Sequence, residues 1–189
     1  ASDIFLFSVS EGREGPCIPY PALMDCEISG TVAQAARLAF TRGEELWASR
    51  SSLISHTTGI AWDVRIPGGL TSGFKRSLAG EGFSLVHFRA PTEGGVLTLG
   101  ANAPGRIEQW DLEADGPVVT TRGAFLAAWG PDVRITASLA KRAGAAFFGG
   151  AGFLLQRIEG RGTALIHGRG DFRQEVLFAG EERRVSTGN

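Results

Sequence analysis

The chain has 189 residues, of which 43% are hydrophobic and 21% charged, so it can bury one substantial core or two small ones and has the composition of a folded globular protein. Its formal net charge is −1 and it contains no long basic run, which argues against a nucleic-acid partner. The longest uncharged stretch, residues 143–156, is rich in glycine and too short to cross a bilayer as a helix. The N-terminus also lacks the basic and apolar segments of a signal peptide, so we expect a cytoplasmic protein.

Taken in chain order, the sequence predicts strands. Residues 1–23 form an N-terminal extension in which "DIFLFSV" predicts an added edge strand and "PCIPYPAL" an extended linker. Residues 31–40 could form a helix, but they precede a Gly-Glu turn as later strand-like segments do, which favours a strand. "WDVRI" (62–66) and "VRITASLA" (133–140) alternate, so each predicts a strand with one face in the core. "FSLVHF" (83–88) is apolar on both faces and predicts a strand covered on both sides.

Turn-forming residues separate these segments at short intervals. Gly, Pro, Asn and Asp gather in stretches such as "APTEGG", "GANAPG" and "EADGP". Short strands divided by such turns are typical of an all-β sandwich or barrel. The fold class we predict is therefore all-β.

Several landmarks occur twice in the same order. "DVRI" stands at 63–66 and again at 132–135, and "GEGF" at 80–83 is matched by "GAGF" at 150–153. A Lys-Arg pair lies between the two landmarks in each copy. A Gly turn followed by a short apolar strand, "GGVLTLG" and "GRGTALIHG", comes further on in each copy. Four landmarks at nearly one offset indicate an internal repeat.

The repeat divides the domain at 24–189 into units at about 32–106 and 107–170, with an incomplete third unit at 171–189. The third unit has only its first half, which predicts that the natural protein continues past Asn189. Three such units would make a pseudo-threefold β structure.

Three long blocks carry a family resemblance. "IPGGLTSGFKRSLAGEGFSLVHF", "TTRGAFLAA" and "GAAFFGGAGFLLQRIEGRGTALIHGRG" resemble the bacterial and archaeal members of the "altered inheritance of mitochondria" family. The resemblance covers about residues 24–189, although a third Gly-Glu-Gly block that family members normally carry is missing. It implies a double-stranded β-helix or β-sandwich of pseudo-threefold repeats, like the tryptophan RNA-binding attenuation protein (TRAP-like), assembled as a homo-oligomer. The resemblance also implies that eukaryotic members of the family are associated with the mitochondrial inner membrane. It implies no biochemical activity and no catalytic residue for this chain.

No constellation of catalytic or metal-binding residues stands out. His56, His87 and His167 are isolated and form no His-x-His motif, so we predict no metal site. His87 is expected to be a strand histidine with one satisfied hydrogen bond. No Gly-x-Ser-x-Gly or phosphate-loop pattern is present, and Cys17 and Cys26 are expected to be free thiols. We expect no catalytic residue and no cofactor.

The Lys-Arg pairs are the strongest polar candidates. Lys75, Arg76, Lys141 and Arg142 occupy equivalent places in two repeats and could form part of a basic ring that contacts an anion or an acidic partner. The alternative is that they are ordinary solvated charges. Glu81 is a weaker candidate, because its counterpart in the second repeat is alanine.

The apolar candidates are Phe147, Phe148 and Phe153, which stand among small residues. If exposed, they would form an oligomer interface or contact a membrane surface; the alternative is that they fill the core. The carboxylate pairs at 44–45 and 181–182 fall at equivalent turns and are expected to be solvated.

The sequence therefore favours a non-enzymatic oligomeric β scaffold that binds a protein partner or acts at a membrane surface, peripheral to the inner membrane. The alternative from the fold superfamily is a ring that binds a small molecule or RNA. An enzyme would need a pocket of titratable groups that the sequence does not reveal.

Overall fold

The computed structural model describes residues 4–5, 24–67, 84–140 and 153–183, with side chains from residue 24 onward except at 138–140 and 153–154. The described residues form fifteen strands and no helix, which confirms the all-β prediction. The strands are β1 (Ile4–Phe5), β2 (Asp25–Ser29), β3 (Ala35–Phe40), β4 (Glu45–Ser49), β5 (Leu53–His56), β6 (Ala61–Arg65), β7 (Leu85–Arg89), β8 (Gly95–Gly100), β9 (Arg106–Asp111), β10 (Val118–Thr121), β11 (Phe125–Trp129), β12 (Arg134–Ala140), β13 (Phe153–Glu159), β14 (Thr163–Gly168) and β15 (Phe172–Arg173).

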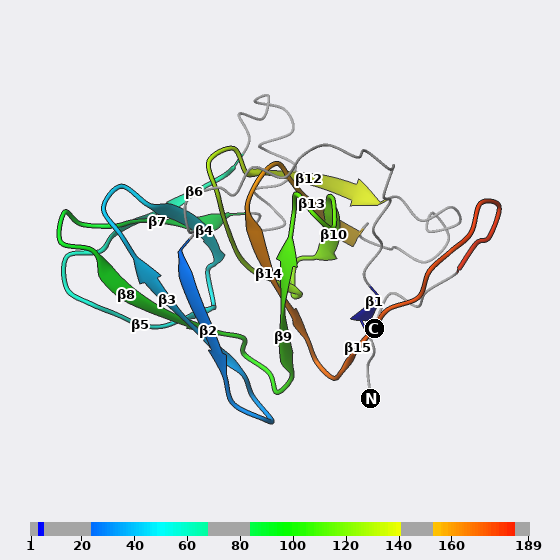
Figure 1. The fold of residues 1–189 in the computed structure, drawn as a ribbon, viewed down its shortest axis with the longest axis horizontal. Coiled ribbons are helices and arrows are strands. Elements are labelled where there is room, and N and C mark those ends of the chain that lie inside the picture. The colour runs from blue at the N-terminus through cyan, green and yellow to red at the C-terminus, as the bar shows by residue number, and fades with distance from the viewer. Residues whose placement is uncertain (1–3, 6–23, 68–83, 141–152, 184–189) are drawn as a thin grey trace.

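The strands form three main antiparallel sheets, shown in Figure 1. A six-stranded sheet has the order β6-β7-β4-β11-β14-β9, a four-stranded sheet has the order β2-β3-β8-β5, and a three-stranded sheet has the order β10-β13-β12. A short parallel pair of β1 and β15 completes the described strands. The predicted strand within residues 31–40 is thus confirmed as β3.

Two hydrophobic cores make the six-stranded sheet a central layer. One core packs β3 and β8 of the four-stranded sheet against one face of β4, β7, β11 and β14, with Leu38, Phe88 and Leu165 fully buried. The other packs the three-stranded sheet against the opposite face, around Phe125 and Ile158. The fold is therefore a layered β-sandwich, and every residue of β11 and β14 is buried because both faces of these strands are covered.

The same pairing order occurs twice along the chain. In the first half β7 pairs with β4 and β6, and β8 pairs with β3 and β5. In the second half β13 pairs with β10 and β12, and β14 pairs with β9 and β11. The ladder between β4 and β11 joins the two sets into the six-stranded sheet. The two sets of strands are separated along the chain by about the same interval as the paired sequence landmarks. The internal repeat and its pseudo-threefold symmetry remain predictions.

The two turns with carboxylate pairs also share one geometry. The Glu44 amide donates to the Thr41 carbonyl, and the Glu44 carboxylate accepts from the Thr41 amide. Glu181 makes the same two bonds with Phe178, over 2.9 and 3.1 Å. The Glu44 and Glu181 carboxylates therefore close their own turns.

The predicted burial pattern is right for two strands and wrong for a third. Four consecutive residues of β7, from Leu85 to Phe88, are buried, as expected for a strand covered on both sides. In β12, Ile135 and Ala137 are buried and alternate with exposed neighbours, as expected.

The wrong prediction concerns β6. The alternation within residues 62–66 places Trp62 and Val64 on one face and predicts that this face is in the core, but the two side chains are 54% and 51% exposed. Trp62 is paired with Phe88 of β7 and Val64 with Val86, and these two β7 residues are buried in the first core. Because β6 is the edge strand of the six-stranded sheet, its apolar face lies at the rim of that core.

The described residues contain no helix long and apolar enough to cross a membrane.

Candidate anion-binding pocket

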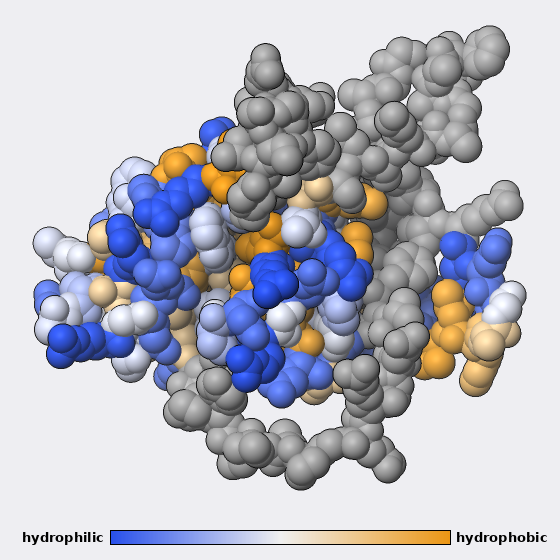
Figure 2. Space-filling model, turned by 90° about the horizontal axis from the view of Figure 1, so that it is seen from above, coloured by the Kyte–Doolittle hydropathy of each residue, from blue (hydrophilic) through white to orange (hydrophobic). Residues whose placement is uncertain are grey.

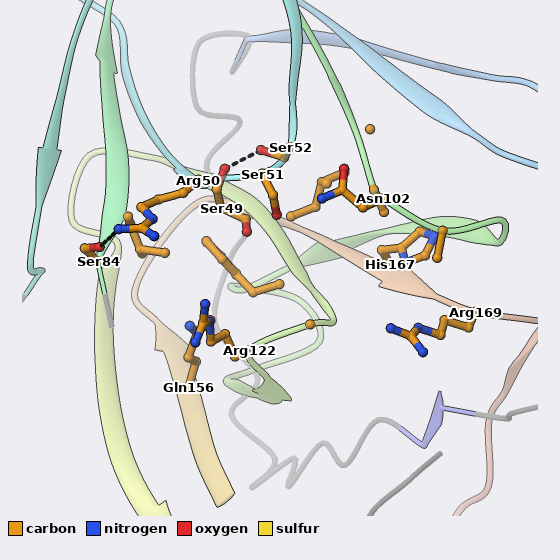
Figure 3. A pocket seen from close by; sticks show the side chains of 17 residues that line it. Ser49, Arg50, Ser51, Ser52, Ser84, Asn102, Arg122, Gln156, His167 and Arg169 are labelled. Carbon is orange, nitrogen blue, oxygen red and sulfur yellow. Dashed lines mark hydrogen bonds between the residues drawn. The ribbon is translucent and has the colours of Figure 1, made fainter. Parts of the chain in front are cut away.

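A cavity of about 540 Å³ lies where several strand ends meet. Its wall is built by the turn between β4 and β5, the start of β7, the residues after β8, the turn between β10 and β11, one residue of β13 and the end of β14. Figure 3 shows these segments around the cavity. The β4–β11 and β11–β14 ladders hold most of them in place, so the described wall of the pocket is formed by the folded sheet.

Three arginines surround the cavity. Arg50 comes from the β4–β5 turn, Arg122 from the β10–β11 turn, and Arg169 follows β14, and all three are exposed (Figure 3). Arg50 Nη1 donates to the Ser84 hydroxyl over 3.1 Å. The described residues that line the cavity include no carboxylate. The described lining therefore carries positive side chains only, although the whole chain has a net charge of −1.

A serine-rich turn adds hydroxyl groups to the wall. Ser49, Ser51, Ser52 and Ser84 all line the cavity. The Ser52 hydroxyl donates to the Ser49 carbonyl over 2.6 Å, and the Ser52 amide donates to the same oxygen over 3.2 Å. These two bonds close the turn that presents Arg50. Hydroxyls and guanidinium groups together are the donors that proteins use for phosphate and carboxylate groups.

The floor of the cavity is buried and partly apolar. Leu85, Phe125 and Leu126 are nearly inaccessible to solvent. Gln156 and His167 also line the cavity and are 1% and 3% exposed. Among the described residues, Gln156 Oε1 and His167 Nε2 have no hydrogen-bond partner. Buried polar atoms are usually paired, so two such atoms in one cavity suggest that something else satisfies them.

His167 is held neutral by its surroundings. Burial lowers its pKa, the positive charge of Arg169 lowers it further, and a hydrogen bond with the Ala103 backbone acts in the opposite direction. Gly105 lies against this histidine, because a β-carbon at Gly105 would stand 2.8 Å from His167 Nε2. The imidazole of His167, near the end of β14, therefore packs against the connection between β8 and β9.

A second buried histidine, His87, lies in β7 of the six-stranded sheet. His87 Nε2 is 3.2 Å from Glu45 Oε2, its Nδ1 is 3.8 Å from Asp63 Oδ1, and its ring lies 4.5 Å from that of Trp47. The first distance is short enough for a hydrogen bond, whereas His87 Nδ1 and Asp63 Oδ1 have no hydrogen-bond partner among the described residues. Burial lowers the pKa of His87 more than the Glu45 carboxylate raises it. Asp63 itself pairs with Arg65 over 2.7 Å.

The two buried histidines predict a loss of stability in mild acid. Burial lowers the pKa of both His87 and His167 below the value of about 6.5 in the unfolded chain, so the unfolded state binds more protons once the pH falls through that value. The free energy of unfolding is thus expected to fall between pH 7.5 and 5.5. Urea denaturation at both pH values measures this.

Variants separate the histidines from other groups. In the double variant His87→Gln with His167→Gln the difference between the two pH values should shrink. The exposed His56, changed to Gln, should leave the difference as it is. An undiminished pH dependence in the double variant would contradict the assignment.

Most sequence candidates fall outside the described residues. These are Lys75, Arg76, Glu81, Lys141, Arg142, Phe147 and Phe148, together with Cys17. Phe153 begins β13, but its side chain is outside the description. Cys26 is a free thiol, as expected, and burial raises its pKa to about 11. In the described part of the chain, no three His, Cys, Asp or Glu side chains are grouped to hold a metal ion.

The pocket arginines were missed as candidates, although the sequence held one signal. Arg50 and Arg122 take matching places in the two predicted repeats, each after a strand and before a small residue. Arg169 and Gln156 carry no such signal.

Comparisons with known proteins decide the family. The sequence profile described as mitochondrial biogenesis AIM24 matches residues 26–189. The chain belongs to this AIM24 family. That confirms the resemblance seen in the sequence. No curated protein matches the chain at a significant level.

A solved structure shares the fold of this AIM24 protein. It is the crystal structure of protein SPYM3_0169 from Streptococcus pyogenes, with a TM-score of 0.60 and 21% identity. The match covers 77% of this chain and 64% of that chain, so the sequence described here spans less than two thirds of its structural neighbour. At this identity the likeness concerns the fold alone. The biochemical function of the family is unknown, so the pocket is the main guide to function.

Proposed function

We propose that the protein is a binding protein whose pocket takes a small molecule with at least one phosphate or carboxylate group. The observation that carries this proposal is the gathering of three guanidinium groups around a cavity whose described lining includes no carboxylate. An anion bound among three guanidinium groups is attracted by all of them and can accept hydrogen bonds from them. The alternative function considered from the sequence was a ring that binds a small molecule or RNA. The present proposal takes up the small molecule.

The chemistry of the lining favours binding over catalysis. Guanidinium groups remain protonated at all physiological pH values and serve as hydrogen-bond donors. Carboxylates, which can act as general bases, are missing from the described lining, and His167, the histidine that does line it, is almost completely buried.

Calorimetric titration with inorganic phosphate, inorganic pyrophosphate and citrate tests this proposal. We expect saturable binding of at least one anion with a dissociation constant between about 1 μM and 1 mM, tighter for the higher charge. The affinity should fall as sodium chloride is raised, because salt screens exposed charges. The absence of saturable heat with all three anions would contradict the proposal.

A second candidate function, a homo-oligomeric scaffold, is favoured by exposed apolar side chains. Trp62 and Val64 form the rim of β6 described above. Val176 and Phe178 are 74% and 72% exposed on the C-terminal arm, defined as residues 174–183. The arm projects from the body in Figure 1 and carries hydrophobic surface at the right of Figure 2. Exposed apolar surface of this kind often marks a contact with another protein or a membrane.

Native mass spectrometry tests the scaffold. We expect a discrete homo-oligomer that dissociates to monomers in the variant Trp62→Ser with Val64→Thr, because the apolar area at the β6 rim is lost. A matched pair at the arm, Val176→Thr with Phe178→Ser, shows which surface is used. A monomeric wild-type chain that sediments with lipid vesicles would instead favour peripheral membrane contact.

A further inference from the structure

We infer that the pocket ligand is a phosphorylated polyol or sugar, in which the phosphate lies among the arginines and a hydroxyl group reaches the buried floor. This inference rests on the proposed anion-binding function and names the class of ligand.

The first argument is the division of the cavity into two layers. The charged side chains Arg50, Arg122 and Arg169 are exposed and define the outer layer, whereas Phe125 and Gln156 are buried and define the inner layer. A phosphate in the outer layer can accept hydrogen bonds from guanidinium groups, often in bidentate pairs. It cannot satisfy Gln156 Oε1 in the inner layer, because an ionised phosphate offers no hydrogen to this acceptor.

The second argument is the size of the cavity. A volume of about 540 Å³ equals that of on the order of eighteen water molecules at ~30 Å³ each. An inorganic phosphate would occupy a small part of this space. The volume falls within the range of about 300–1,000 Å³ that is typical of pockets for organic ligands.

The third argument is the chemistry of the floor. Gln156 Oε1 is an acceptor without a described partner, on a side chain that is 1% exposed. Gln156 lies in the middle of β13, paired with Thr120 of β10 and Ala137 of β12, so its backbone is held on both sides. An acceptor fixed in this way calls for a donor, and a ligand hydroxyl supplies one. A buried polar group also discriminates strongly against ligands that leave it unpaired.

The experiment compares three probes by calorimetry: inorganic phosphate, ribose 5-phosphate and pentyl phosphate. The two organic probes have the same number of carbon atoms, but pentyl phosphate lacks the hydroxyl groups. We expect ribose 5-phosphate to bind at least about tenfold more tightly than pentyl phosphate. In the variant Gln156→Leu, which keeps a similar volume, this preference should vanish while the affinity for inorganic phosphate stays the same. Gln109→Leu, on the exposed face of β9, is the matched control and should behave as wild type.

The same chemistry can come from a free metabolite or from a lipid headgroup. Flotation with vesicles of phosphatidylcholine, with and without phosphatidylglycerol, distinguishes the sources. Binding to the phosphatidylglycerol vesicles that is lost in Gln156→Leu supports the inference with a lipid as the source.

Two negative outcomes are distinct. Equal binding of ribose 5-phosphate and pentyl phosphate, with Gln156→Leu unchanged, overturns the polyol inference but leaves the anion pocket intact. The absence of binding by all probes and both vesicles overturns the anion pocket as well.

Discussion

Reversing two of the three pocket charges, in the variant Arg50→Glu with Arg169→Glu, is expected to weaken the binding of inorganic pyrophosphate by at least about 100-fold. A hydrogen bond to a charged group contributes about 1.5–3 kcal/mol, so the loss of two such bonds costs about 3 kcal/mol or more. The two introduced carboxylates also repel the ligand. Both arginines are exposed, so the variant is expected to fold. Calorimetric titration measures the change in the dissociation constant.

The matched control is Arg42→Glu with Arg173→Glu. It changes the net charge by the same amount at two exposed arginines that do not line the cavity. We expect pyrophosphate to bind this control within about threefold of wild type, since exposed charges that do not touch the ligand are screened by salt. An equal loss of affinity in both variants would show that the net charge governs binding and that the pocket does not.

The variant Gly105→Ala is expected to lower the free energy of unfolding by about 3 kcal/mol or more. Gly105 has a φ of +151°, which non-glycine residues rarely adopt, and a β-carbon there would stand 1.8 Å from the Gly168 carbonyl oxygen. The backbone cannot easily move away, because the Gly105 amide donates to the Val32 carbonyl and its own carbonyl accepts from the Gln34 amide. Urea denaturation followed by circular dichroism gives the difference in stability.

Gly123→Ala is the control for this prediction. Gly123 lies in the β10–β11 turn, where no atom lies within 4 Å of an added β-carbon and φ is not positive. Its substitution should change the free energy of unfolding by no more than about 0.5 kcal/mol. Similar losses in Gly105→Ala and Gly123→Ala would mean that the close approach of Gly105 to Gly168 does not constrain the fold.

Much of the fold could be predicted because local pattern and burial agree. The alternation that marks β12 and the continuous apolar run that marks β7 both follow from the two-residue period of strands, and both were found. The prediction failed at Trp62 and Val64, where the same alternation marks an edge strand. Periodicity shows which residues share a face, but it does not show whether another sheet covers that face.

The pocket could not be predicted for a different reason. Arg50, Arg122 and Arg169 are far apart in the sequence, and only the β4–β11 and β11–β14 ladders bring their segments together. Single arginines at strand ends resemble ordinary solvated charges. Gln156 stands in the apolar run "FLLQRI", where the sequence gives no sign that its side chain faces a cavity.

The claim that the pocket binds anions is tested most directly by nuclear magnetic resonance of the arginine Nε–Hε groups during titration with inorganic pyrophosphate. We expect the signals of Arg50, Arg122 and Arg169 to shift together and to saturate at one ligand per chain, whereas the signal of the exposed Arg42 stays in place. Small shifts that spread over all arginines and never saturate would contradict it, because they would show screening of surface charge in place of a binding site.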